Sequence, residues 1–113
     1  VLPDMTAPAT IKPIEQITSR YYLRLMVMDK PGVLARFTEV FGRHEISISA
    51  VQQREGQVGE LRGQPIVPVV VLTHQAKEGN IRQAINEIAK LDFCAKRPVC
   101  IRVVDEYPEW AKT

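Results

Sequence analysis

Hydrophobic and polar residues follow two periods along this chain, one typical of strands and one typical of helices. Four segments have the two-residue alternation or the β-branched composition of strands: residues 20–28, 46–55, 65–74 and 97–105. In the first, Leu23, Leu25 and Val27 form one face of the strand. The opposite face is apolar enough that we expect partial cover, for instance by another chain; it holds Tyr22, Arg24, Met26 and Met28.

The other three strands carry signals of their own. Alternation in the second places Ile46, Ile48 and Ala50 on one face, and Ser47, Ser49 and Val51 on the other. The third contains Pro68, which has no N–H for a ladder, so regular pairing is expected to begin after it. Val99, Ile101 and Val103 share one face of the last strand. The glycine-rich segment 56–64 is expected to be a mobile hairpin loop.

Two further segments have the helical period. The first begins after Gly32 and carries one apolar stripe of Val33, Leu34, Phe37, Val40 and Phe41. The second, residues 77–90, carries a stripe of Ile81, Ala84, Ile85, Ile88 and Leu91. The order β-α-β-β-α-β predicts an α+β, ferredoxin-like sandwich. Its four-stranded antiparallel sheet has both helices on one face, with the first and third strands central.

Length and composition indicate one globular domain. The chain has 113 residues, of which 45% are hydrophobic and 25% charged. We expect residues 1–18 to be a linker or the tail of a preceding unit, residues 19–106 to be the folded domain, and residues 107–113 to be a tail. The first segment is proline-rich and shows no stable period.

The same composition argues against several classes of partner. A net charge of +2 is too small to suggest nucleic acid. No apolar run approaches the roughly 20 residues that cross a bilayer, and no secretory signal opens the sequence. Cys94 and Cys100 fit no metal or redox spacing, so we expect partly buried thiols in a reducing compartment, the cytoplasm.

Catalytic motifs are missing from the sequence. There is no dinucleotide fingerprint, no phosphate-binding loop and no metal-spaced set of histidines or cysteines. His44 and His74 accompany no nucleophile or carboxylate pattern. An RNA-binding module of this topology would need aromatic residues in its central strands, and the third strand has none. We therefore expect no catalytic residue, no metal and no cofactor in this chain.

The turn after the first strand, DKPG, is the strongest candidate site. The N–H groups at the start of a helix carry partial positive charge. Gly32 lets a ligand approach that backbone, and Pro31 fixes the turn without losing a needed donor. Asp29 is placed to accept hydrogen bonds from an ammonium group. The helix start and this carboxylate together would suit an amino acid. The residues alone favour a structural interpretation, in which Asp29 caps the helix and Pro-Gly shapes the turn.

The sequence resembles the ACT domain, a small amino-acid-sensing module. The family pattern of a strand, D-x-P-G-V-L, a helix and a strand opening with I-S-I appears as Asp29, Pro31 to Leu34, and Ile46 to Ile48. The segments ITSRYYLRLMVMDKPGVLARF, PVVVLTHQAKEGNIRQAINEIAKLDF and VCIRVVD are similar to the end of bacterial homoserine dehydrogenases. This likeness runs from about Ile17 to Asp105.

The resemblance implies a regulatory domain. The catalytic domain of the parent enzyme would lie upstream, so that residues 1–18 would be a linker or the tail of this upstream catalytic domain. It implies feedback inhibition by threonine, a homodimer formed through edge strands and the first helix, and an NAD(P) cofactor bound elsewhere in the parent enzyme. The implied ligand contacts are Asp29, Lys30, Pro31, Gly32, Val33 and Leu34, with Ser47 and Ser49 on the second strand. The alternative is a structural dimerisation module that binds no ligand.

Overall fold

The structure is a computed structural model that describes residues 13–54 and 56–103. Its elements are η1 (Ile14–Gln16), β1 (Thr18–Met28), α1 (Val33–Arg43), β2 (Ile48–Gln53), β3 (Gly59–Leu61), β4 (Gln64–Thr73), β5 (Ala76–Lys77), α2 (Glu78–Ala89) and β6 (Val99–Val103). The predicted tail, residues 107–113, and most of the predicted linker lie outside the described residues. The domain boundaries therefore stay a prediction.

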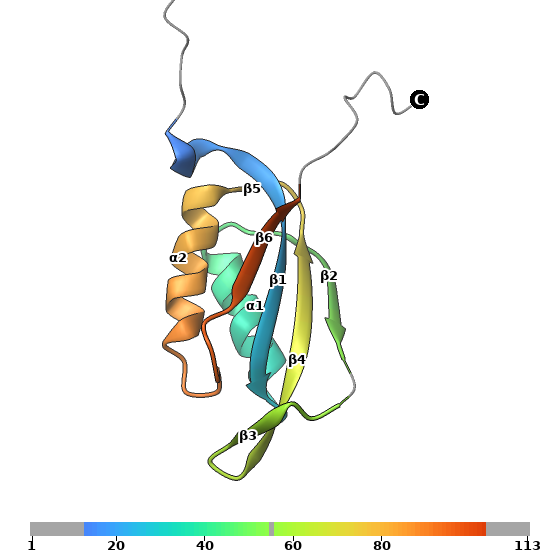
Figure 1. The fold of residues 1–113 in the computed structure, drawn as a ribbon. Helices are drawn as coiled ribbons and strands as arrows, with labels where there is room; N and C mark the ends of the chain where they lie inside the picture. The colour runs from blue at the N-terminus through green and yellow to red at the C-terminus, as the bar shows by residue number, and fades with distance from the viewer. Residues whose placement is uncertain (1–12, 55, 104–113) are drawn as a thin grey trace, which may run out of the picture.

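The predicted ferredoxin-like fold is confirmed. The four main strands are antiparallel in the order β2-β4-β1-β6, so the first and third predicted strands are central. Both helices lie on the same face of this sheet (Figure 1). Two short strands were not predicted: β3 pairs with the start of β4, and β5 pairs with Thr18 and Ser19 at the start of β1. They extend the sheet without changing its topology.

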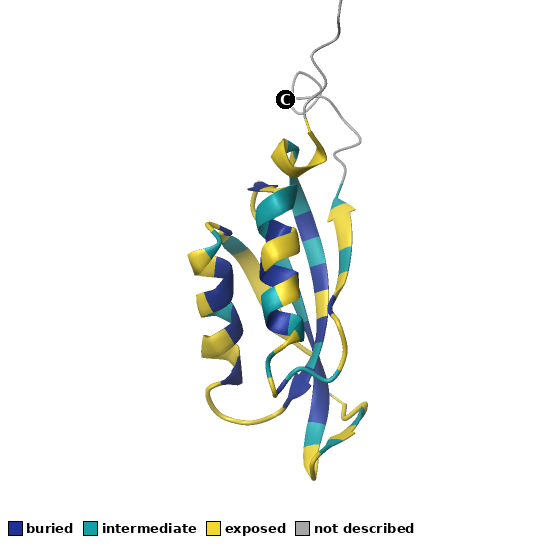
Figure 2. Cartoon of the chain, turned by 90° about the vertical axis from the view of Figure 1, so that its left-hand side faces the viewer, coloured by how far each residue is buried: buried dark blue, intermediate teal, exposed yellow. Residues whose placement is uncertain are grey.

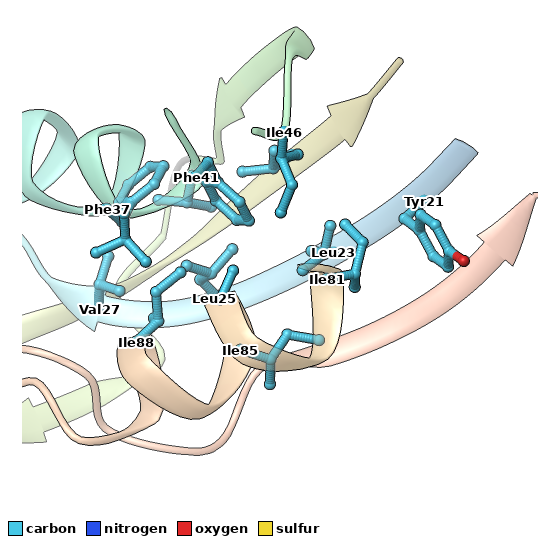
Figure 3. Packing of buried hydrophobic residues seen from close by; sticks show 14 of the residues in the cluster. Tyr21, Leu23, Leu25, Val27, Phe37, Phe41, Ile46, Ile81, Ile85 and Ile88 are labelled. Atoms are coloured by element: carbon cyan, nitrogen blue, oxygen red, sulfur yellow. The ribbon is translucent and has the colours of Figure 1, made fainter. Parts of the chain in front are cut away.

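The hydrophobic core lies between the sheet and the helices. Tyr21, Leu23, Leu25 and Val27 of β1 are almost completely buried against both helices. The helical stripes supply the other half of the core, with Phe37 and Phe41 from α1 and Ile81, Ala84, Ile85 and Ile88 from α2 (Figure 3). Figure 2 shows that burial is confined to one side of each helix, as the periodic pattern predicts.

The prediction for the faces of β1 needs one correction at its end. Met28 was expected on the open face, but it is 4% exposed and belongs to the core. Pairing with β4 continues without a shift to Met28, opposite Ile66, so its place in the strand is as predicted and only its burial differs. The Met28 N–H donates to the carbonyl of Phe93, in the segment that follows α2. Tyr22 and Met26 do lie on the open face and are half-buried.

The apolar row of β6 does share one face, but it is the face without helices. Tyr22 pairs with Ile101 and Arg24 with Val99, and directly opposed residues lie on the same side of a sheet. Val99 and Ile101 are accordingly 57% and 55% exposed. The helix-facing positions of β6 are instead Cys100 and Arg102.

A β-bulge overturns the predicted faces of β2. Ile48 pairs with Thr73, whereas Ala50 pairs with Leu72, so Ser49 is the extra residue. The bulge reverses the alternation: Val51, opposite buried Val71, faces the helix side, and Ala50 faces the open side. The regular pattern failed here because one inserted residue moves every later side chain to the other face.

Pairing around Pro68 also differs from the prediction. The ladder between β1 and β4 continues through Pro68, opposite Met26, to Ile66, opposite Met28. The Pro68 carbonyl accepts a hydrogen bond from the Arg54 N–H at the β2 edge. The N and O atoms of one strand residue point to the same side of the strand. The position of the missing Pro68 N–H therefore faces the interval between β2 and β3, like the carbonyl, and no hydrogen bond to β1 is lost.

The glycine-rich segment forms a β-hairpin rather than a simple loop. β3 pairs with β4 through Leu61 and Gln64, which leaves Arg62 and Gly63 as a two-residue turn. Their φ angles are 49° and 78°, the positive values required by the turn type that matches strand twist. Glycine at the second position supplies one of these angles without strain.

Candidate functional site

A hollow of about 160 Å³ lies at the start of α1, between the β1–α1 turn and the ends of β2 and β4. We call it the α1 hollow. All six predicted residues of the turn border it: Asp29, Lys30, Pro31, Gly32, Val33 and Leu34. Phe37, Val67 and Val69 form its apolar side. Its walls therefore combine free backbone at a helix start with an apolar floor.

The backbone at the start of α1 has unused donors. Gly32 is the N-cap residue, with φ 87° and no side-chain capping bond. Among the described residues, no backbone acceptor is found for the N–H groups of Gly32, Leu34 and Ala35. Such groups at a helix start carry partial positive charge and favour an anion. The hollow can thus accept a carboxylate at this end.

Asp29 does not cap α1, so the structural interpretation of this residue is wrong. The cap position is Gly32, three residues later. The Asp29 N–H donates to the Pro65 carbonyl at 2.8 Å, which fixes the backbone, while the residue itself is exposed. Its carboxylate is the acidic group of the α1 hollow and is available to a cation.

The two predicted serines are not brought to this hollow. Ser47 and Ser49 lie at the start of β2 and are exposed, whereas Gln53 at its end lines the hollow. Four residues of strand separate Ser49 from Gln53, roughly 14 Å at about 3.4 Å per residue. Sequence analysis missed Gln53 because its position depends on the bulge, which turns it to the helix side opposite Val69.

The β2 edge beside the α1 hollow is open. Within the part of the chain that the structure describes, β2 pairs only with β4, so its other side presents unpaired backbone groups. Leu34 in the first turn of α1 is 52% exposed, and Val51 on the helix side of β2 is 37% exposed. This edge therefore offers both backbone donors and apolar side chains to another chain.

Among the residues that the structure describes, the other reactive groups do not form a catalytic set. His44 contacts Glu87 through Nε2 at 3.0 Å, and Arg43 pairs with the same carboxylate, so this cluster links the ends of the two helices. Burial raises the pKa of the Cys94 thiol, which opposes a reactive thiolate. In residues 13–54 and 56–103 no group of three His, Cys, Asp or Glu side chains is placed to hold a metal ion, and no helix there is long and apolar enough to span a membrane.

Known proteins share both the sequence and the fold. The ACT domain family matches residues 21–90. A homoserine dehydrogenase from Methylobacillus glycogenes is 44% identical over 101 residues, which cover 89% of this chain and 24% of that protein. The crystal structure of a homoserine dehydrogenase from Thiobacillus denitrificans is 36% identical, with a TM-score of 0.70, over 83% of this chain and 19% of the other.

A more distant structure shares the fold alone. The ACT domain of a GTP pyrophosphokinase from Chlorobium tepidum is 10% identical, with a TM-score of 0.51, over 77% of this chain and 100% of that domain. This chain spans about a quarter or less of the homoserine dehydrogenases that it matches. The sheet order, the glycine at the start of α1 and the match over residues 21–90 lead to one conclusion: the chain belongs to the ACT domain family.

Proposed function

We propose that this chain is the amino-acid-binding regulatory domain of a homoserine dehydrogenase, and that threonine is its effector. The α1 hollow is the observation that carries the proposal, because it joins unpaired helix N–H groups to a free carboxylate. Membership of the ACT family and similarity to homoserine dehydrogenases supply the enzyme context.

The two ends of the α1 hollow suit the two charges of an amino acid. The effector carboxylate would accept hydrogen bonds from the N–H groups of Gly32 and Leu34, and its ammonium group would face Asp29. An apolar cavity of about 150 Å³ holds benzene, so a hollow of about 160 Å³ suits a side chain as small as that of threonine. Gln53 is within the same hollow and can hydrogen-bond the threonine hydroxyl.

A homodimer would complete this site. Antiparallel pairing of two β2 strands would satisfy the open edge and continue the sheet across two copies. The same approach would cover Leu34 and Val51, which are exposed in the isolated chain. An effector bound beside this edge would then contact both copies and favour one arrangement of the dimer.

Regulation would follow from a difference in affinity. Threonine can bias the attached catalytic region only by binding one dimer arrangement more tightly than another. That region, outside this chain, would hold NAD(P) and convert aspartate semialdehyde into homoserine in the cytoplasm. This chain would supply the sensor and the dimer contact rather than catalytic groups.

Calorimetry with the 113-residue chain tests effector binding. Threonine, serine, methionine and isoleucine are titrated separately, and threonine is expected to give the tightest binding. Asp29→Ala should abolish that signal, whereas Glu60→Ala, which removes an exposed carboxylate on β3, should leave it unchanged. Absence of heat and of a thermal shift with every amino acid at millimolar concentration would refute the effector proposal.

The alternative function is a dimerisation module without a ligand, and the exposed Val51, which does not line the α1 hollow, favours it. Sedimentation equilibrium separates the two functions. Val51→Glu should dissociate the dimer, whereas Ile101→Glu, a more exposed apolar site on β6, should not. A dimer lost in Val51→Glu but indifferent to every amino acid would support the alternative.

A further inference from the structure

A second hollow, of about 560 Å³, lies between α2 and β6 at the opposite edge of the sheet from β2. We call it the α2–β6 hollow. Its polar lining comes from β1, α2, β6 and the segment before β6. The residues are Tyr21, Glu78, Arg82, Arg97, Cys100 and Arg102. None of these residues contributes to the α1 hollow, and the proposed effector site does not use them.

Tyr21 places a buried hydroxyl group in this hollow without a partner. The residue is 1% exposed, and its hydroxyl oxygen lies near the Glu78 and Arg102 side chains without a hydrogen bond of ordinary geometry to either. Figure 3 shows this oxygen at the end of the core, beside β6. A buried hydroxyl group left unpaired costs roughly 1–3 kcal/mol, so native proteins seldom leave one in this state.

Glu78 provides a second unsatisfied atom at the same place. Its Oε2 is buried and has no hydrogen-bond partner in the described part of the chain. The Glu78 carboxylate forms ion pairs with two arginines: Arg82 Nε lies 3.4 Å from Oε1, and Arg102 Nη2 lies 3.6 Å from Oε2, beyond hydrogen-bond length. Two orphaned polar atoms thus share a hollow that is large enough for a small molecule.

The surrounding charge indicates which ligand class would satisfy these atoms. Three guanidinium groups, from Arg82, Arg97 and Arg102, line the hollow with one carboxylate, from Glu78, while Glu15 outside the lining lies 3.8 Å from Arg82, which leaves an excess of at least one positive charge. Planar guanidinium groups recognise carboxylate and phosphate oxygens through paired hydrogen bonds. An anion balances this excess, whereas a zwitterionic amino acid does not.

The orphaned Glu78 oxygen adds a requirement for a donor. A bare anion would be repelled by this carboxylate, but a hydroxyl group on the ligand can donate to Glu78 Oε2 and accept from the Tyr21 hydroxyl. We propose that the α2–β6 hollow is a second ligand site, for a small oxyanion that carries a hydroxyl group. Phosphate monoesters and hydroxy-dicarboxylates share this chemistry.

Isothermal titration at low salt tests the site with four probes. Ribose 5-phosphate and malate carry both the oxyanion and the hydroxyl group, whereas methyl phosphate and succinate carry only the oxyanion. At least one hydroxylated probe should bind about tenfold more tightly than its counterpart without a hydroxyl group, and the pair that responds identifies the ligand class. Equal binding within both pairs, or no binding of any probe at millimolar concentration, would overturn the proposal.

Substitutions locate the binding and separate it from the effector site. Tyr21→Phe retains the buried ring and should weaken the tighter probe about tenfold, as should Arg102→Gln. Arg36→Gln makes the same charge change on the exposed surface of α1 and should have no effect. Saturating threonine should not displace the probe. Displacement by threonine, or equal affinities in Tyr21→Phe, Arg102→Gln and Arg36→Gln, would contradict a separate site.

Discussion

Replacing Gly32 by alanine tests the physical basis of the α1 start. Gly32 has φ 87°, in the left-handed region, where a side chain costs about 1–2 kcal/mol. A Cβ at this position would meet no atom within 4 Å, so the cost arises from the backbone and not from a clash. Alanine also restricts the unfolded chain, which returns about 0.4–1 kcal/mol. The expected net loss in the free energy of unfolding is about 1 kcal/mol.

Urea denaturation followed by circular dichroism measures this loss, and a domain of this size should also melt about 4–8 °C lower. Gly42→Ala is the matched control, because Gly42 lies inside α1, has no positive φ, and would likewise bring its new Cβ within 4 Å of no other atom. There, alanine should stabilise the helix by up to about 0.5–1 kcal/mol. A Gly32→Ala chain as stable as the wild type, or two variants that shift in the same direction, would refute the reasoning.

Three further substitutions test the core and the two clusters of polar groups. Phe41→Ala removes a fully buried ring that meets Phe37 edge-to-face at 6.2 Å, and urea titration should show a loss of about 3–5 kcal/mol. Burial, reinforced by Glu78, raises the pKa of Tyr21 from 10.0 to about 12. The folded state therefore holds the Tyr21 hydroxyl proton more tightly than the unfolded state does. The stability of the wild type relative to Tyr21→Phe should fall as pH rises from 10 to 12. Hydrogen bonds from Arg43 and His44 lower the pKa of Glu87. The stability that Glu87→Gln removes should therefore be present above the usual glutamate pKa and disappear as pH falls through the lowered value. Urea titrations of both chains across acidic pH measure this difference.

The elements with a strong period were predictable because each has one buried face. Ile81, Ile85 and Ile88 repeat at helical spacing and are all buried against the sheet, so the pattern and the packing agree. The departures occur where a single residue changes the backbone. No sequence feature marks Ser49 as a bulge, and Pro68 is tolerated only because its missing N–H faces the interval after β2.

The candidate sites divide in the same way. The DKPG turn was predictable because the residues that form it are consecutive and each has a local role at a helix start. Gln53 joins them only through the register of β2 with β4. Tyr21, Glu78 and Arg102 meet through the pairing of β1 with β6 and the position of α2, and such long-range contacts leave no periodic signal.

The positions of both hollows follow from how β1 is used. Its middle residues, Leu23 and Leu25, are completely buried between sheet and helices, which leaves no room for a ligand there. Beyond this packed centre, α1 begins after Met28 at one end of the strand and opens its first N–H groups, while Tyr21 near the other end turns a hydroxyl group towards β6. The two hollows therefore lie at the two ends of β1, on opposite sides of a core that the sequence pattern already identifies.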